Sequence, residues 1–278
     1  MEAPRPTQAL LLVGHGSSFG TDAGAPVRAH AERIRGWRVF DEVATAFVKE
    51  APFLDGAVGR LASEDVYIVP VFLAEGYYTR GVVPRELGLK SSDGAIPSWP
   101  GDRRVRYTAA VGSHPAMIRT IERRARRALG ETGPGDDAAL VVIGHGTEKH
   151  PGSAGTVLDL TARLRRRSGF AGVTCGFLDQ EPRIDAVVAT VSARRVVLVP
   201  YFLADGMHTR ETIPEILRLD GARTVRDGQE LWYTPPVGTL PEIARLIVDL
   251  ARRAGARVPT KRPARDRSPT RGTGATPE

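Results

Sequence analysis

The second half of the chain alternates short apolar runs with segments in which apolar residues recur every three or four positions. This pattern predicts strands at 138–143, 172–178, 195–202 and 230–234. It predicts helices at 153–167, after Pro182, around Pro214 and from Pro241 to about Ala254. Because strands that alternate with helices form parallel sheets covered on both faces, we expect an α/β protein.

The chain also contains an internal repeat with an offset of 130 residues. The sequence LLLVGHGS at residues 10–17 recurs as LVVIGHGT at 140–147, and VPVFLAEG at 69–76 recurs as VPYFLADG at 199–206. The first half therefore follows the same order of elements. We expect two tandem three-layer α/β/α lobes, each with a mainly four-stranded parallel sheet.

Composition fits this organisation. Of the 278 residues, 41% are hydrophobic and 26% are charged, so the chain has enough apolar residues to bury a core. From the repeat we expect lobes at 1–132 and 138–256. The net charge is +7, and residues 257–278 hold six basic and two acidic side chains. This segment therefore carries +4 of the net charge. That segment is rich in Pro, Thr and Gly, so we predict a disordered basic tail. The remaining +3 and the 6% aromatic content predict no nucleic-acid partner.

Other residue counts exclude several classes of protein. The single cysteine, Cys175, excludes a disulfide framework, a cysteine zinc site and a self-contained iron–sulfur cluster. No apolar run approaches the roughly 18 residues of a membrane span, and the start of the chain lacks a signal-peptide pattern. We therefore expect a cytoplasmic protein with no membrane partner. Two fused halves can form a cleft in a monomer, and a homodimer remains open.

Two histidines of the second half follow predicted strands. His145 lies between two glycines directly after the first strand, and His208 follows the third strand. The carboxyl ends of parallel strands meet at one edge of a sheet, where ligands bind. A pair of imidazoles at that edge suits a divalent metal such as Co, Ni, Zn or Fe, and it suits proton transfer near neutral pH.

A carboxylate follows the second predicted strand. Glu181 precedes a helix-starting proline, so it is either a favourable charge at a helix N-terminus or a third group beside the two imidazoles. The first half keeps His15, but Tyr78 stands where the second half has His208, and Ala51 replaces Glu181. Only the second half therefore retains all three groups.

Together these motifs resemble those of the sirohydrochlorin chelatases, the CbiX/SirB family, in its two-half form. The resemblance covers about residues 8–255 and rests on the Gly-His-Gly strand ends, Phe-Leu-x-x-Glu-Pro, and Val-Pro-x-Phe-Leu-Ala-x-Gly-x-His-x-x-x-x-x-Pro. It implies a two-lobed chelatase fold with a tetrapyrrole bound between the lobes. It implies ATP-independent insertion of Co²⁺ or Fe²⁺, with Ni²⁺ suiting the same ligands, in cobalamin or siroheme biosynthesis. The family's metal-handling and catalytic residues map onto His145, His208 and Glu181.

The resemblance also predicts how the substrate is held. Sirohydrochlorin carries eight carboxylates, so cationic side chains at the rim should help, and Arg80 and Arg210 are the best placed. His15 and Tyr78 complete the expected tetrapyrrole contacts. The alternative is a non-catalytic tetrapyrrole- or metal-binding protein for delivery or sensing. A histidine phosphatase is disfavoured because no arginine precedes either Gly-His-Gly histidine, and a serine hydrolase is disfavoured because GxSxG is absent.

Overall fold

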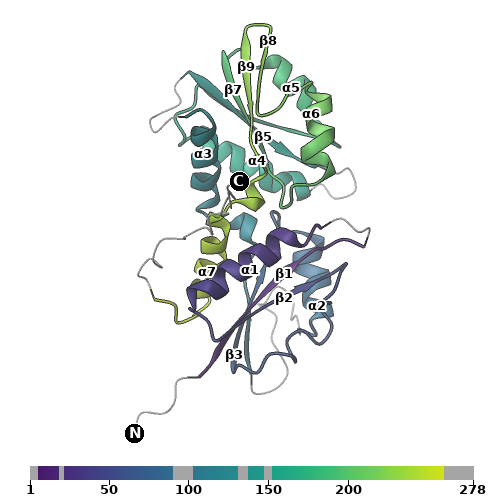
Figure 1. Cartoon of the computed structure of the whole chain (residues 1–278), viewed down its shortest axis with the longest axis vertical. Coiled ribbons are helices and arrows are strands. Elements are labelled where there is room, and N and C mark those ends of the chain that lie inside the picture. Colours follow the sequence, from purple (N-terminus) through teal and green to yellow (C-terminus); the bar gives the residue numbers. More distant parts are fainter. Residues whose placement is uncertain (1–5, 19–21, 90–102, 131–136, 147–151, 260–278) are drawn as a thin grey trace, which may run out of the picture.

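The computed structural model describes residues 6–18, 22–89, 103–130, 137–146 and 152–259, which form two stacked α/β lobes (Figure 1). The N-terminal sheet has the parallel order β2-β1-β3-β4, from β1 (Gln8–Gly14), β2 (Glu42–Phe47), β3 (Asp65–Pro70) and β4 (Arg104–Tyr107). The C-terminal sheet has the order β6-β5-β7-β9-β8, from β5 (Ala138–Gly144), β6 (Gly172–Phe177), β7 (Arg195–Pro200), β8 (Arg223–Arg226) and β9 (Gln229–Tyr233). The two-lobed α/β prediction is confirmed.

The C-terminal sheet has one strand more than the four predicted. β8 pairs antiparallel with β9 at the edge of an otherwise parallel sheet. The two strands are joined by Asp227 and Gly228, which both have positive φ angles of 51° and 79°. Asp-Gly is a strong hairpin signal because a two-residue turn of this kind needs two such φ angles.

Seven α-helices flank the sheets: α1 (Ala25–Trp37), α2 (Val83–Glu86), α3 (Met117–Ala128), α4 (Gly152–Arg165), α5 (Ile184–Thr190), α6 (Ile213–Ile216) and α7 (Glu242–Arg253), counted over the described ranges. The two halves differ after their second strands. The second half has α5 there, whereas residues 54–60 of the first half form turns, so the expectation of identical element order is wrong at this point. Gly56, with φ +65°, and Gly59 disfavour a helix in this segment.

Each strand sends alternate side chains to opposite faces of its sheet. In β1, Leu11 and Val13 face a core that belongs to the N-terminal lobe alone. Leu10 and Leu12 face a second core, which continues without interruption into the C-terminal lobe through Leu140. The inner faces of both sheets therefore share one hydrophobic core.

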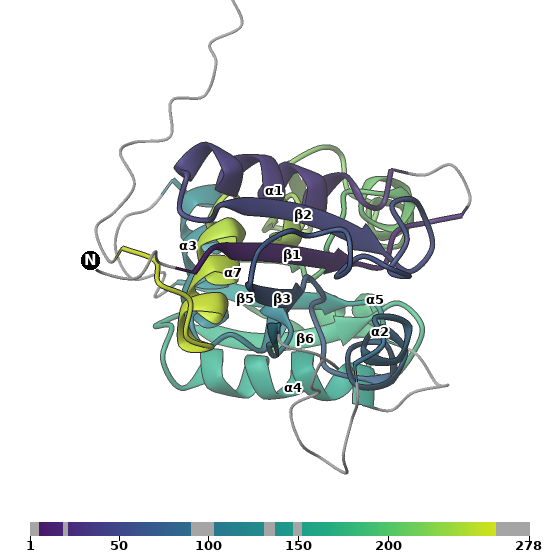
Figure 2. The same cartoon turned by 90° about the horizontal axis from the view of Figure 1, so that it is seen from below.

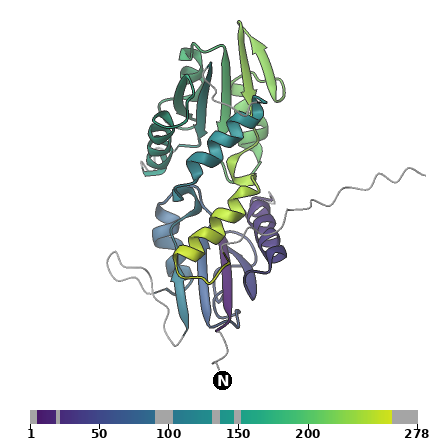
Figure 3. The same ribbon diagram turned by 90° about the vertical axis from the view of Figure 1, so that its left-hand side faces the viewer.

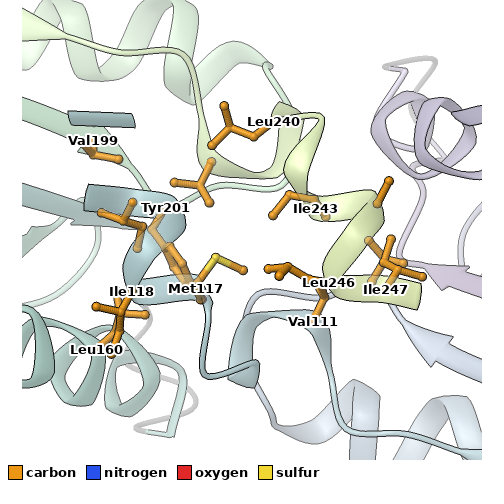
Figure 4. Close-up of a cluster of buried hydrophobic side chains, with 14 of the residues drawn as sticks. Val111, Met117, Ile118, Leu160, Val199, Tyr201, Leu240, Ile243, Leu246 and Ile247 are labelled. Atoms are coloured by element: carbon orange, nitrogen blue, oxygen red, sulfur yellow. The ribbon is translucent and has the colours of Figure 1, made fainter. Parts of the chain in front are cut away.

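The last helix of each half packs on the other half. α3 contacts α4 and β7 of the C-terminal lobe, whereas α7 contacts α1 and β3 of the N-terminal lobe (Figures 2 and 3). Figure 4 shows Met117 of α3 beside Tyr201, and Ile247 of α7 on the side of the N-terminal lobe. The Tyr201 hydroxyl donates to the carbonyl oxygens of Leu73 (3.0 Å) and Gly112 (3.1 Å). Each repeat is one continuous segment of sequence, but its last helix packs on the lobe that the other repeat forms.

The chain beyond α7 returns to the first strand. The backbone N–H of Arg257 donates to Oε1 of Gln8 (2.7 Å), and its guanidinium lies 3.3 Å from the carboxylate of Asp65. Arg257, the first residue of the predicted tail, is therefore anchored to the N-terminal lobe. Residues 260–278 of the predicted tail, and residues 131–136 near the boundary between the two predicted lobes, lie outside the described ranges. Among the helices that the structure describes, none has the length and apolar character needed to cross a membrane.

Candidate metal-binding site

The two predicted histidines of the second half meet at the carboxyl edge of the C-terminal sheet. β5 and β7 are parallel neighbours, so His145 after β5 and His208 after β7 reach the same edge. Their ring centroids lie 4.8 Å apart at an interplanar angle of 88°. His208 opens a π-helical turn, His208–Thr212, which leads into α6. The expected convergence of these two imidazoles is present.

The glycines around His145 are required by close packing. A Cβ at Gly144 would lie 2.9 Å from the ring of Phe177. Gly146 has φ +72°, and a Cβ there would lie 2.5 Å from Gln180. Small residues thus let the chain turn sharply and leave the His145 side chain 47% exposed.

The hydrogen bonds orient the His145 ring. Its Nδ1 donates to the carbonyl oxygen of Gly146 (2.8 Å) and lies 3.3 Å from Oδ2 of Asp179. Two acceptors beside Nδ1 place the ring proton there, so Nε2 keeps its lone pair for a ligand or a proton. Nδ1 of His208 lies 3.4 Å from the hydroxyl of Thr212.

The environment favours a neutral His208. Burial lowers the pKa of His208 below the usual histidine value, and a positive charge on neighbouring His145 lowers it further, while Asp179 opposes both effects. A neutral imidazole is the form that binds metal or accepts a proton. His208 is therefore ready for either task near neutral pH.

The structure brings Asp179, rather than Glu181, beside the imidazole pair. The exposed Glu181 carboxylate accepts the backbone N–H of Arg183 (3.1 Å), as a helix-start carboxylate does. The described residues contain no group of three or more His, Cys, Asp and Glu side chains that could hold a metal. The three-ligand set therefore stays a prediction, and only His145 and His208 converge.

Asp179 was missed because its place depends on strand register. β5 and β6 pair with Gly144 opposite Phe177, and the backbone N–H of Asp179 donates to the carbonyl oxygen of His145 (3.0 Å). Continuing the parallel register by two residues puts Asp179 opposite Gly146, so its carboxylate lies beside the ring of the preceding residue, His145. Lys49 occupies this place in the first half and donates to the carbonyl of His15. The opposite charges of Lys49 and Asp179 at matching positions of the repeat could have indicated that Asp179 belongs to the site.

The first half preserves the geometry of the pair without its chemistry. The rings of His15 and Tyr78 lie 4.7 Å apart at 84°, almost as in the second half. Phe72 stacks on Tyr78 with centroids 6.3 Å apart. A phenol, which has no ring nitrogen, replaces the second imidazole, so this edge lacks a pair of neutral nitrogen ligands.

A cavity of about 800 Å³ adjoins the histidine pair and is lined by residues of both halves, including His208 and Arg210. Nε of Arg210 donates to Asp205 (2.9 Å), and Arg210 is largely exposed. Arg80 lines a different, smaller cavity of about 430 Å³ and lies 3.9 Å from Glu75. The two predicted rim arginines thus belong to separate cavities.

These features define a class of protein: tandem α/β lobes with a histidine pair at one sheet edge beside a cavity that both halves line. The CbiX family model matches residues 9–128 and 139–254, which covers most of both halves. The chain belongs to the CbiX family.

Curated relatives agree with this assignment. The probable sirohydrochlorin cobaltochelatase of Halobacterium salinarum is 37% identical over 273 residues, which covers 90% of this chain and 93% of that protein. The sirohydrochlorin cobaltochelatase of Methanocaldococcus jannaschii is 36% identical over 139 residues, which covers 41% of this chain and 96% of that protein. The shorter relative therefore matches about one repeat.

Solved structures share the fold. DR2241 from Deinococcus radiodurans, a multi-domain protein with structural similarity to chelatases, aligns with a TM-score of 0.76 and 32% identity over 89% of this chain. This chain spans 55% of the length of that protein, which has two additional domains. SirB from Bacillus subtilis with Fe³⁺ aligns with a TM-score of 0.71 and 20% identity, over 90% of this chain and 96% of that one.

Proposed function

We propose that this protein inserts a divalent metal, Co²⁺ or Fe²⁺, into sirohydrochlorin or a related tetrapyrrole without ATP, in cobalamin or siroheme biosynthesis. The observation that carries the proposal is the imidazole pair of His145 and His208, 4.8 Å apart, at the edge of a cavity of about 800 Å³. Membership of the CbiX family and the names of its relatives supply the substrate class.

The imidazole pair would bind the incoming ion. Nε2 of His145 and a nitrogen of neutral His208 displace water from the hydrated metal, because imidazole suits borderline divalent ions. The aspartate beside Nδ1 of His145 fixes the ring so that Nε2 faces the ion. The pair thus holds the metal next to the cavity in which the macrocycle lies.

Insertion exchanges one divalent ion for two pyrrole N–H protons, so charge balances. As the metal moves to the ring nitrogens, the imidazole nitrogens that held it become free to accept these protons. Asp179, 3.3 Å from Nδ1, keeps the His145 ring oriented for this step. Solvent then takes the protons from the exposed His145 side chain.

The carboxylates of the substrate need cationic partners. Arg210 lines the same cavity as His208 and can exchange its exposed contact with Asp205 for a substrate carboxylate. Arg80, in the smaller cavity, would serve a substituent that reaches across the lobes. His15 and Tyr78 would contact the tetrapyrrole without binding metal.

An anaerobic absorbance assay tests the proposal. Protein is mixed with sirohydrochlorin and with Co²⁺, Fe²⁺ or Ni²⁺ separately, and a metallated-product spectrum should form faster than without protein. His145→Ala should reduce the rate to the background, while the matched variant His15→Ala should retain most of it. Tight binding of the macrocycle without metallation by any metal would instead indicate a delivery or sensing protein.

A further inference from the structure

The cavity beside the histidine pair is built from both halves of the chain. The C-terminal half contributes Ala204, Asp205, Gly206, Met207, His208, Arg210, Glu211 and Thr239. The N-terminal half contributes the first turns of α1 and the residues before it, from Asp22 to His30. The half that lacks an imidazole pair therefore supplies a wall for the half that has one.

The N-terminal wall is small and apolar. Ala25 and Ala29 lie one helical turn apart on α1, so both methyl groups are on the same face, and both line the cavity with Pro26. The C-terminal wall carries Met207, a large apolar side chain that is 62% exposed, next to His208. Apolar side chains on two sides of a cavity next to the histidine pair suit the conjugated core of a macrocycle.

The matching cavity of the other sheet lacks this wall. Its α4 side presents Gly155 and Asp159 at the repeat positions of Ala25 and Ala29. Asp159 lies 3.5 Å from Arg163, so the helix face is polar and paired at this position, although the buried Leu160 also lines the cavity. The pair of alanines therefore lies only in the cavity that also carries His208.

The alanine wall is fixed to both halves. The buried His30 on α1 donates from Nε2 to the carbonyl oxygen of Gly238 in the C-terminal half (2.8 Å). Toward the N-terminal half, Arg28 donates to Glu50 (2.5 Å), whose carboxylate also accepts the backbone N–H of Ser17 (3.1 Å). These bonds hold the start of α1 in place, so the width of the cavity is set before a ligand binds.

We propose that the N-terminal half selects the tetrapyrrole. One side of the macrocycle packs on Ala25 and Ala29 of α1 while His145 and His208 deliver the metal. This proposal rests on the proposed function and adds the role of the N-terminal half. Ala25 and Ala29 are specificity residues in it, because their methyl groups set how closely α1 approaches the ring. The N-terminal half, which has no imidazole pair, would then contribute to binding of the tetrapyrrole.

The test separates macrocycle binding from metal binding. Ala29→Leu adds a branched side chain to the wall at an exposed helix position, where leucine is well tolerated, and the fold is checked by circular dichroism. Ala186→Leu makes the same change at an exposed position of α5 that lines neither cavity. Each variant is titrated with metal-free sirohydrochlorin by absorbance and with Co²⁺ alone by calorimetry, and then assayed for turnover.

Ala29→Leu should weaken sirohydrochlorin binding about tenfold or more, because bulk added to a shaped surface is costly, while Co²⁺ binding stays within about twofold of wild type. Ala186→Leu should change neither the sirohydrochlorin affinity nor the Co²⁺ affinity. If Ala29→Leu binds sirohydrochlorin as tightly as the wild type, and the wild type metallates it, then the proposed role of the Ala25–Ala29 face is wrong and the proposed function is still supported. A wild-type protein that neither binds nor metallates the macrocycle would overturn both.

Discussion

The helix exchange predicts that the two lobes unfold together. Ile247 on α7 is fully buried in the core that both lobes share, although it belongs to the C-terminal half of the sequence. Ile247→Ala should cost about 3 kcal/mol of unfolding free energy, within the usual 2–5 kcal/mol for removing a buried isoleucine side chain. A protein of ordinary stability has about 5–15 kcal/mol in total, so the loss is easy to measure.

Two tryptophans report on the two lobes separately. Trp37 ends α1 in the N-terminal lobe and Trp232 lies in β9 of the C-terminal lobe. Single-tryptophan versions would be unfolded in urea and followed by fluorescence, with and without Ile247→Ala. Both probes should report the same midpoint and should shift together, because one continuous core joins the lobes. Val225→Ala, at a side chain that is 65% exposed, is the control and should change stability by less than about 0.5 kcal/mol.

A shift of the Trp37 transition alone would refute this reasoning. It would mean that the N-terminal lobe, with α7 on its sheet, unfolds independently of the C-terminal lobe. The lobes would then behave as two domains despite the exchanged helices. The fixed width of the cavity between them would also lose its physical basis.

Two further predictions concern the metal site. Asp179→Asn should lower Co²⁺ affinity about 10- to 100-fold, because the carboxylate that orients His145 is lost, whereas Glu181→Gln should change that affinity less than about threefold. Both affinities are measured by calorimetry. The opposite order would mean that Glu181, and not Asp179, supports metal binding. The pKa of His208 is lowered, so its imidazole stays neutral at neutral pH and Co²⁺ affinity should fall only as the pH drops through a value below the usual 6.5. Titrations from pH 5 to 8 should show this loss in wild type and a weaker pH dependence in His208→Ala; equal slopes would contradict it.

The repeat shows how two copies of one unit can take different tasks. His15 with Tyr78 has the ring geometry of His145 with His208, so both sheet edges share one arrangement while a phenol stands where the other half has an imidazole. The same half carries the alanine face that lines the other half's cavity. Loss of the imidazole pair in the first half is therefore compatible with a retained role in binding.

Much of the site could be read from local sequence. Gly144 and Gly146 around His145 indicated a sharp exposed turn, and strand order indicated that His208 would meet it. These inferences succeed because neighbouring parallel strands bring their carboxyl ends to one edge. Asp179 was not identified, because a shift of one or two residues in register decides which carboxylate lies beside the imidazole.

Periodicity and repetition can be recognised along a chain without its fold, so they were enough to predict the tandem α/β organisation, the histidine pair and the contrast between the halves. The sheet that each half's last helix covers depends instead on long-range packing. The apolar face of α7 shows that the helix must be buried, but it fits either sheet, and only the shared core directs it to the N-terminal one. The cavity follows from the same long-range packing, since its two walls are almost 180 residues apart in the chain, from Ala29 to His208.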